Sequence, residues 1–267
     1  MVRKSDPDRY FASLFASADK RRLLFVLYAF NHEIARAAVA MREPMMAEIR
    51  LQWWRDALLE ACAGQPRAHP VAIGLSELFR DTGVTGAALE SLIDARETEI
   101  SPAPFPDLVA LEGHADATAG ALMRIAASVL NSDADVEELA RGAGTAYAMA
   151  GVLRAIPFHA AHGRTFVPAD LLAAEGLAAN DLLSPRNATA LQRVISNLAA
   201  VARHHFAQAK RIRIPRYVHP AILPASLVPA YLSHVVRNRR DPAQARGDVS
   251  LFRRQLILLR SATLRRL

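Results

Sequence analysis

The amino-acid sequence predicts an all-α protein whose helices pack as a bundle around one large core. Apolar residues recur at intervals of three and four along most of the 267 residues, whereas the alternating pattern of a half-buried strand is hard to find. Glycine is scarce, with 12 residues, and alanine, the best helix former, is abundant. Since 52% of the residues are hydrophobic, we expect residues 1–267 to form a single domain.

The 15 prolines and the capping residues divide the first half of the chain into six expected helices. Asp6 or Asp8 suits the N-cap of the first helix, Pro44 falls in the first turn of the third, and Thr85 is the N-cap of the fifth. The expected ranges are 6–17, 18–41, 43–63, 70–81, 85–100 and 108–130.

The second half contains five further expected helices. The acidic stretch "NSDADVEE" places carboxylates in the first turn of the first of them, which the helix dipole favours. The expected ranges are 133–153, a short helix within 162–177, then 187–210, 220–237 and 250–267.

The last helix, at about 250–267, is basic and amphipathic. Such a helix could lie on an anionic membrane surface, or it could be the last helix of the bundle with a basic outer face. We favour packing slightly. Its apolar and basic residues are Leu251, Phe252, Leu256, Leu259 and Leu267 with Arg253, Arg254, Arg260, Arg265 and Arg266.

Composition limits the classes of function. The net charge of +7 attracts phosphates, anionic lipid head groups, nucleic acid or acidic proteins, but no nucleic-acid motif accompanies it, so we expect no nucleic-acid partner. The single cysteine, Cys62, excludes an internal disulfide framework and a cysteine-based zinc site, and fits a cytoplasmic compartment. The sequence contains neither an apolar run of ~18 residues nor a secretory signal at its start.

Five stretches in a fixed order carry motifs of one known family. They are "LLFVLYAFNHEIARAAV", "RLQWWRDAL" followed by "HPVAIGL", "LIDARETEI", "HADATAGALMRIAASVL" and "GAGTAYAMAGVLRAIPFHAAHGRTFVPADLL". Together they resemble the squalene/phytoene synthase family of head-to-head prenyl transferases over roughly residues 6–236. The resemblance implies an isoprenoid synthase-like helical bundle around a central cavity.

The chain departs from this family where the chemistry resides. The resemblance implies two aspartate motifs on helices that hold Mg²⁺ between them, because Mg²⁺ prefers carboxylate and phosphate oxygens. Here Ala35, Arg36 and Val39 stand at the acidic positions of the first motif, and Ala155 and His159 stand at those of the second. We therefore expect no catalytic residue, no metal site and no cofactor.

This loss favours a role outside catalysis. The pattern looks most like the divergent branch of the family that contains a mitochondrial complex I assembly factor. That resemblance implies a respiratory complex I subunit or assembly intermediate as partner, or an isoprenoid or lipid ligand, and a cytoplasmic protein that could lie peripherally at the inner membrane. The alternative is a divergent prenyl transferase that acts on isoprenoid diphosphates with Mg²⁺ and uses Glu97 or Glu99.

Two groups of residues are candidates for ligand contacts. A surviving anion or diphosphate pocket would use basic side chains, which alternatively satisfy loop carbonyls or face solvent. Aromatic residues would line the cavity, although a plain core role is about as consistent with the sequence. The pocket candidates are His32, Arg154, His159, His162 and Arg164, joined by Arg36, and the cavity candidates are Tyr28, Phe30 and Tyr147.

Overall fold

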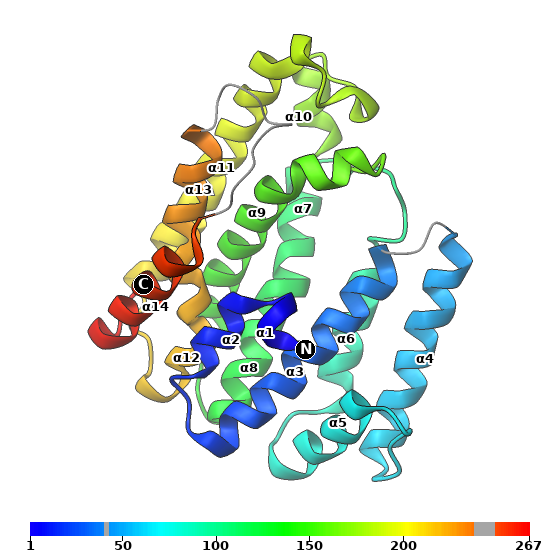
Figure 1. Cartoon of the computed structure of the whole chain (residues 1–267), viewed down its shortest axis with the longest axis vertical. Helices are drawn as coiled ribbons and strands as arrows, with labels where there is room; N and C mark the ends of the chain where they lie inside the picture. Colours follow the sequence, from blue (N-terminus) through cyan, green and yellow to red (C-terminus); the bar gives the residue numbers. More distant parts are fainter. Residues whose placement is uncertain (40–42, 238–248) are drawn as a thin grey trace.

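The computed structural model describes residues 1–39, 43–237 and 249–267, and in these ranges it consists of helices and loops without a strand (Figure 1). The all-α prediction is confirmed. The first half comprises α1 (Val2–Ser5), α2 (Pro7–Ser13), α3 (Ala18–Val39), α4 (Pro44–Cys62), α5 (Pro70–Asp81), α6 (Gly86–Glu97), α7 (Leu108–Ala115), the π-helical turn η1 (Asp116–Gly120) and α8 (Ala121–Leu130).

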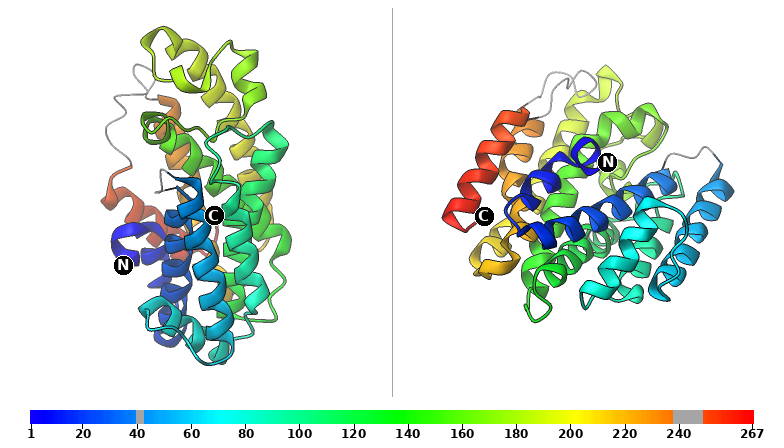
Figure 2. Two further views of the ribbon diagram at one scale, coloured as in Figure 1. Left: turned by 90° about the vertical axis from the view of Figure 1, so that its right-hand side faces the viewer. Right: turned by 60° about the horizontal axis from the view of Figure 1, so that its bottom comes forward.

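The second half continues the bundle and ends with a helix on its outside. It comprises α9 (Glu137–Ala161), α10 (Ala169–Ala174), η2 (Ala179–Asp181), η3 (Pro185–Asn187), α11 (Ala188–Arg211), η4 (Arg216–Val218), α12 (His219–Ile222), η5 (Leu223–Leu227), α13 (Val228–Arg237) and α14 (Leu251–Leu264). Figure 2 shows α14 at the edge of the molecule, near the N-terminal helices.

Side-chain caps fix several of the predicted helix starts. The Asp6 carboxylate accepts a hydrogen bond from the backbone N–H of Arg9 at 3.1 Å, and the Thr85 hydroxyl accepts one from Ala88 at 3.3 Å. The Ser250 hydroxyl does the same for Arg253 at 3.4 Å, at the start of α14. Each cap satisfies one of the backbone donors that the first turn leaves unpaired.

Three of the predicted ranges change most. The predicted helix 220–237 is divided into α12, η5 and α13, and two others differ as follows. The predicted helix 108–130 is interrupted by η1, and α9 runs to Ala161 rather than ending at residue 153, with Pro157 inside it. Proline removes one backbone hydrogen bond, yet Leu153 and Ile156 continue the buried stripe of α9 and keep it helical. The predicted end of the second helix, at residue 41, lies outside the described residues.

A close crossing explains two glycines in the centre of the bundle. A Cβ atom added to Gly144 on α9 would lie 2.4 Å from the Cα of Gly120 in η1 and 2.5 Å from its backbone nitrogen. Only residues without a Cβ allow two backbones to approach this closely. The glycine pair therefore sets the depth at which α9 packs on the α7–α8 unit.

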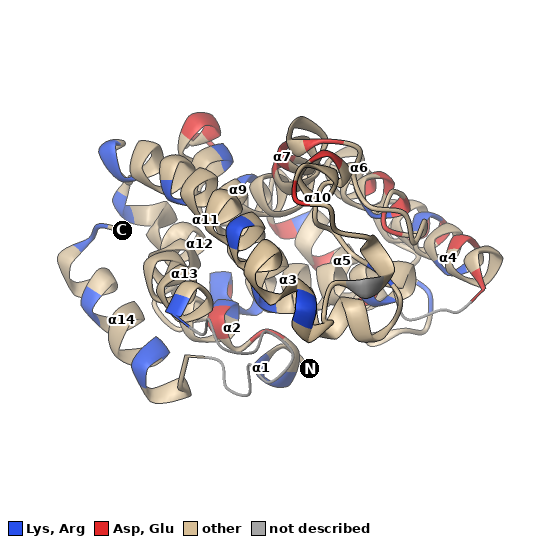
Figure 3. Cartoon of the chain, turned by 90° about the horizontal axis from the view of Figure 1, so that it is seen from above, with Lys and Arg blue, Asp and Glu red and all other residues tan. Residues whose placement is uncertain are grey.

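Charge is unevenly distributed over the surface. Acidic segments gather over α4, α6, α7 and α10, whereas α14 carries basic segments and no acidic one (Figure 3). Within the described residues, no helix is both long enough and apolar enough to cross a bilayer.

Candidate functional site

The end of α3, the end of α9 and the loop after α6 meet at one end of the bundle. Arg164, in the loop after α9, connects the three segments: its Nη1 lies 3.5 Å from the backbone oxygen of Val39, and its Nη2 donates to the carbonyls of Glu99, Ile100 and Ser101. The distances to Ile100 and Ser101 are 3.2 and 3.1 Å. This guanidinium thus satisfies loop carbonyls, which was one of the two roles expected from the sequence.

The positions of the missing aspartates lie on these two helices. Ala35, Val39, Ala155 and His159 are half-buried, and Arg36 is exposed with its Nη2 at 3.6 Å from the carboxylate of Glu33. The alanine and valine side chains offer no oxygen to a cation. Within the described ranges, no three histidine, cysteine, aspartate or glutamate side chains are grouped so as to hold a metal ion.

A buried carboxylate, Glu99, occupies the space next to this junction. Its side chain is 5% exposed, and its Oε1 lies 2.5 Å from Arg96 Nη1 and 2.9 Å from His114 Nε2. Burial opposes ionisation, but the charge of Arg96 and the hydrogen bond and charge of His114 outweigh it and lower the pKa of Glu99. We name Arg96, Glu99, His114 and Asn31 the Glu99 network, because Arg96 Nη2 also donates to the Asn31 amide oxygen at 3.2 Å.

The second acid considered from the sequence lies elsewhere. Glu97 is on the surface, with its side chain 49% exposed, and its Oε1 lies 2.8 Å from Arg55 Nη2. The two glutamates are two residues apart and therefore point to different sides of the chain. Sequence reasoning identified Glu99 but missed Arg96 and His114. The i,i+3 spacing of Arg96 and Glu99 was a signal for the first pair, whereas nothing in the sequence links His114 to Glu99 before the fold is known.

His159 lies beside the Glu99 network and is held by aromatic contacts. Its ring meets Phe166 edge-on at 4.6 Å between centroids, and its Nδ1 is buried without a hydrogen-bond partner among the described residues. Burial lowers the pKa of His159, the charges of Arg164 and His162 lower it further, and Glu99 opposes them. The fold therefore favours the neutral form of this histidine.

The structure brings only part of the predicted anion pocket together. His159, His162 and Arg164 are neighbours, and His162 Nδ1 lies 2.7 Å from the backbone oxygen of Phe158. Arg154 lies on another side of α9, with its guanidinium carbon 3.8 Å from the centroid of the Tyr231 ring. His32 is half-buried on α3. The role of these residues toward an anion stays a prediction.

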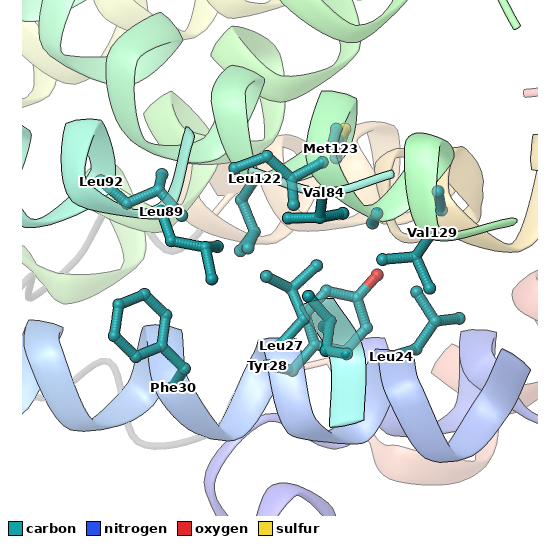
Figure 4. Close-up of a cluster of buried hydrophobic side chains, with 14 of the residues drawn as sticks. Leu24, Leu27, Tyr28, Phe30, Val84, Leu89, Leu92, Leu122, Met123 and Val129 are labelled. Carbon is teal, nitrogen blue, oxygen red and sulfur yellow. The ribbon is translucent and has the colours of Figure 1, made fainter. Parts of the chain in front are cut away.

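The predicted cavity aromatics belong to the packed interior. Tyr28 and Phe30 are buried among leucine, valine and methionine side chains from α3, α6 and α8 (Figure 4). The Phe30 ring meets Trp54 of α4 edge-on at 5.5 Å between centroids. In this structure both residues have the plain core role that the sequence left open.

Tyr147, the third aromatic, takes part in a second polar cluster around Asp8. The Tyr147 hydroxyl donates to Asp8 Oδ2 at 2.9 Å, the Tyr231 hydroxyl donates to the same oxygen, and Arg254 Nη1 lies 3.0 Å from Asp8 Oδ1. Burial and the Asp8 charge raise the pKa of both tyrosines. Sequence reasoning considered Asp8 only as a helix cap, whereas it is a buried acceptor that joins α2, α9, α13 and α14.

The chain is similar to known proteins in both its sequence and its fold. The family model for squalene/phytoene synthase matches residues 2–255. The chain belongs to the squalene/phytoene synthase family.

Solved structures of synthases share the fold of this family member. The crystal structure of a dehydrosqualene synthase superposes with a TM-score of 0.85 at 18% sequence identity, and the match covers 98% of this chain and 93% of the synthase. Squalene synthase HpnC of Alicyclobacillus acidocaldarius covers 90% at a TM-score of 0.77 and 20% identity, with 92% of its own chain included. These matches confirm the isoprenoid synthase-like fold.

Named relatives of this squalene/phytoene synthase family member fall into two groups. "NADH dehydrogenase (ubiquinone) complex I, assembly factor 6" of Mus musculus is 28% identical over 240 residues, which are 89% of this chain and 72% of that protein. "Presqualene diphosphate synthase" of Rhodopseudomonas palustris is 29% identical over 213 residues, 78% of this chain and 76% of that enzyme.

Proposed function

We propose that this squalene/phytoene synthase family member assists the assembly of respiratory complex I and does not transfer prenyl groups. The observation that carries the proposal is the chemistry at the five motif positions: Ala35, Arg36, Val39, Ala155 and His159. None of them supplies a carboxylate, so the donor set does not fit Mg²⁺. The relatives named as complex I assembly factors support the assembly role.

Other contacts at the same end of the bundle support a structural use of the site. Glu99 could have replaced a lost ligand, but its carboxylate is already bound by Arg96 and His114. Arg164 could have held a diphosphate, but its guanidinium donates to backbone carbonyls. A cation bound to Glu99 would have to displace Arg96 and His114, and breaking one buried ion pair costs about 3–5 kcal/mol. A diphosphate bound to Arg164 would leave the carbonyls of Glu99, Ile100 and Ser101 without this donor.

In this proposal the protein is a rigid helical scaffold that binds a complex I subunit or an assembly intermediate on the cytoplasmic side of the membrane. An isoprenoid or lipid bound within the bundle is compatible with the scaffold role, since it requires no ionisation of a diphosphate. Neither cofactor nor metal is needed.

The relatives named presqualene diphosphate synthase favour one alternative, a divergent prenyl transferase. Such an enzyme would need Mg²⁺ and carboxylates outside the two family motifs, and Glu97 and Glu99 were the candidates. The ion pairs of both glutamates with arginines weigh against it.

Deleting the gene tests the assembly role. We expect less fully assembled NADH dehydrogenase on native gels of membranes from the deletion strain, and recovery when the intact chain is expressed from a plasmid. Normal amounts of the assembled complex in the deletion strain would exclude the assembly role.

An activity measurement tests the alternative. The purified chain is incubated with farnesyl or geranylgeranyl diphosphate and Mg²⁺, and released diphosphate is compared with that of a heat-killed sample. We expect no difference. Release above the control, lost in the Glu99→Gln variant, would favour the prenyl transferase.

A further inference from the structure

The last helix, α14, presents its apolar stripe to solvent. Phe252, Leu256 and Leu259 are 77%, 56% and 54% exposed, and at about 100° per residue they lie within an arc of roughly 60°. The opposite side of α14 is buried, with Leu258 in the core and Arg254 paired with Asp8. A helix that only covers a bundle places its apolar stripe inward, so this arrangement needs a second explanation.

Cationic side chains border the exposed stripe. A groove of about 520 Å³ lies between α14, the end of α11 and the segment η5–α13, and it is lined by Lys210, Arg253, Arg260 and Arg266. No aspartate or glutamate lines it, and no ion pair of these four cations is found within the described residues. The groove therefore concentrates positive charge without a compensating carboxylate.

A buried hydroxyl adds a hydrogen-bonding group to the groove lining. Ser226 in η5 is 8% exposed and lines the same groove, and its Oγ has no hydrogen-bond partner among the described residues. Buried hydroxyls are normally paired, so this one is available to an acceptor that enters the groove.

The position of α14 allows a partner with a flat surface to contact both the exposed apolar stripe and the cationic groove. The helix lies at the edge of the bundle with its outer side uncovered (Figures 1 and 2), and it carries basic but no acidic segments (Figure 3). A single peripheral helix with an apolar stripe, flanking arginines and no acids has the chemistry of an interfacial membrane helix. A protein partner would need a groove of matching length that is both acidic and apolar. An anionic bilayer offers negative charge and an apolar interior at once.

We propose that α14 and the groove beside it form a docking surface for a bilayer that contains anionic phospholipids. Phe252, Leu256 and Leu259 enter the boundary between head groups and acyl chains. Lys210, Arg253, Arg260 and Arg266 contact lipid phosphates, with Arg suited to phosphate by its fork of N–H donors. The surface holds the protein on the membrane without a spanning segment, and the inference stands whether or not the chain assembles complex I.

Vesicle binding of the whole 267-residue chain tests the proposal. Vesicles of phosphatidylcholine alone and of phosphatidylcholine with about a third phosphatidylglycerol are sedimented with the protein at low and at high salt. We expect binding to the anionic vesicles at least tenfold stronger than to the neutral ones, and weaker at high salt because exposed charges are screened.

Two triple variants separate the apolar and the cationic contributions. Phe252→Ser with Leu256→Ser and Leu259→Ser should lower binding to anionic vesicles at least tenfold. Arg253→Gln with Arg260→Gln and Arg266→Gln should remove the preference for anionic vesicles.

Matched controls carry the same changes elsewhere on the surface. Leu59 and Val109 are each 74% exposed and Ile49 is 54% exposed, and their change to serine should leave binding unchanged. Arg50→Gln with Arg80→Gln and Arg141→Gln is the control for the arginine variant and should leave the preference for anionic vesicles unchanged. Thermal unfolding of every variant, followed by circular dichroism, checks that the substitutions leave the fold intact.

Three results would overturn the proposal. The first is a wild-type protein that binds neither vesicle type, which would point to a protein partner for α14. The second is equal binding to neutral and anionic vesicles. The third is that the variants on α14 and their matched controls lose binding to the same extent.

Discussion

Arg254 Nη1 lies 3.0 Å from Asp8 Oδ1, so the last helix is joined to the second across 246 positions of sequence. The two side chains are 14% and 6% exposed, and Asp8 also accepts hydrogen bonds from Tyr147 and Tyr231. A buried carboxylate with three donors is a fixed structural element, because each donor offsets part of the cost of removing the charge from water.

Replacing Asp8 by Asn should lower the free energy of unfolding by about 3–5 kcal/mol, because the substitution removes one partner of the buried Asp8–Arg254 ion pair. Urea unfolding followed by circular dichroism measures the change. Arg193→Met is the control, since its pair with Glu175 at 2.6 Å is 56% exposed on the arginine side and should cost about 1 kcal/mol or less. Equal losses in the two variants would contradict the structural role of Asp8.

The Glu99 network gives a second prediction with a control two residues away. Glu99→Gln should destabilise the fold by about 2–4 kcal/mol, since it leaves the Arg96 charge half-buried without its carboxylate. Glu97→Gln removes the same charge from an exposed pair with Arg55 and should cost about 1 kcal/mol or less. Chemical unfolding of the two variants side by side tests the difference, and a Glu97 variant that is the less stable of the two would refute it.

The pH dependence of stability follows from two lowered pKa values. His159 has a folded pKa below its usual 6.5, so the unfolded chain binds a proton more readily. Its contribution to stability is complete above pH 6.5 and is lost as the pH falls from there toward the folded pKa. Glu99, lowered from 4.5, adds a contribution that is complete above pH 4.5 and lost below it. Urea midpoints should therefore fall on acidification.

The histidine part of this dependence has a direct check. His219, whose pKa burial also lowers, contributes with the same sign as His159. We expect His159→Gln to weaken the loss of stability between about pH 6.5 and pH 5, and the double variant with His219→Gln to remove most of it. A slope that both variants leave as in the wild type would show that neither ring is held neutral by the fold.

The crossing of α9 and η1 predicts opposite outcomes for two glycines of one helix. Gly144→Ala would place a Cβ 2.4 Å from the Cα of Gly120, so the backbones must separate, and we expect a loss of about 2 kcal/mol or more. Gly151 on the same helix has no atom within 4 Å of an added Cβ. Its change to alanine should be neutral or should stabilise by up to about 1 kcal/mol, and thermal melting compares the two.

Sequence reasoning located most helices because their signals are local. Thr85 and Ser250 cap the helices that follow them, and the glutamates at the start of α9 stand where the dipole favours them. The interruption of the predicted helix 108–130 was not predicted from the sequence; η1 ends at Gly120, which meets Gly144 of α9 only in the folded chain. The length of α9 was missed for the same kind of reason, because tertiary packing overrides Pro157.

For the candidate site, the sequence could predict only the absence of the carboxylates of the two family motifs. The substitutions at Ala35, Val39 and Ala155 are visible in the sequence alone. Most partners of Glu99 and Arg164 are not, because His114 lies 15 positions from Glu99 and Val39 lies 125 positions from Arg164. For α14 the sequence left open a helix on a membrane surface and a helix packed in the bundle, and we slightly favoured packing, since an amphipathic pattern does not say which side of a helix faces the bundle.

The Asp8 cluster also bears on how the chain folds while it is being made. Asp8 leaves the ribosome early, but Tyr147, Tyr231 and Arg254 are synthesised later, and the last follows 246 residues afterwards. At about 5–20 residues per second this interval is roughly 12–50 seconds. Until then the Asp8 carboxylate lacks its ion pair with Arg254, so α2 cannot complete its docking against α14. The N-terminal segment is thus the first to be translated and among the last to reach its final place.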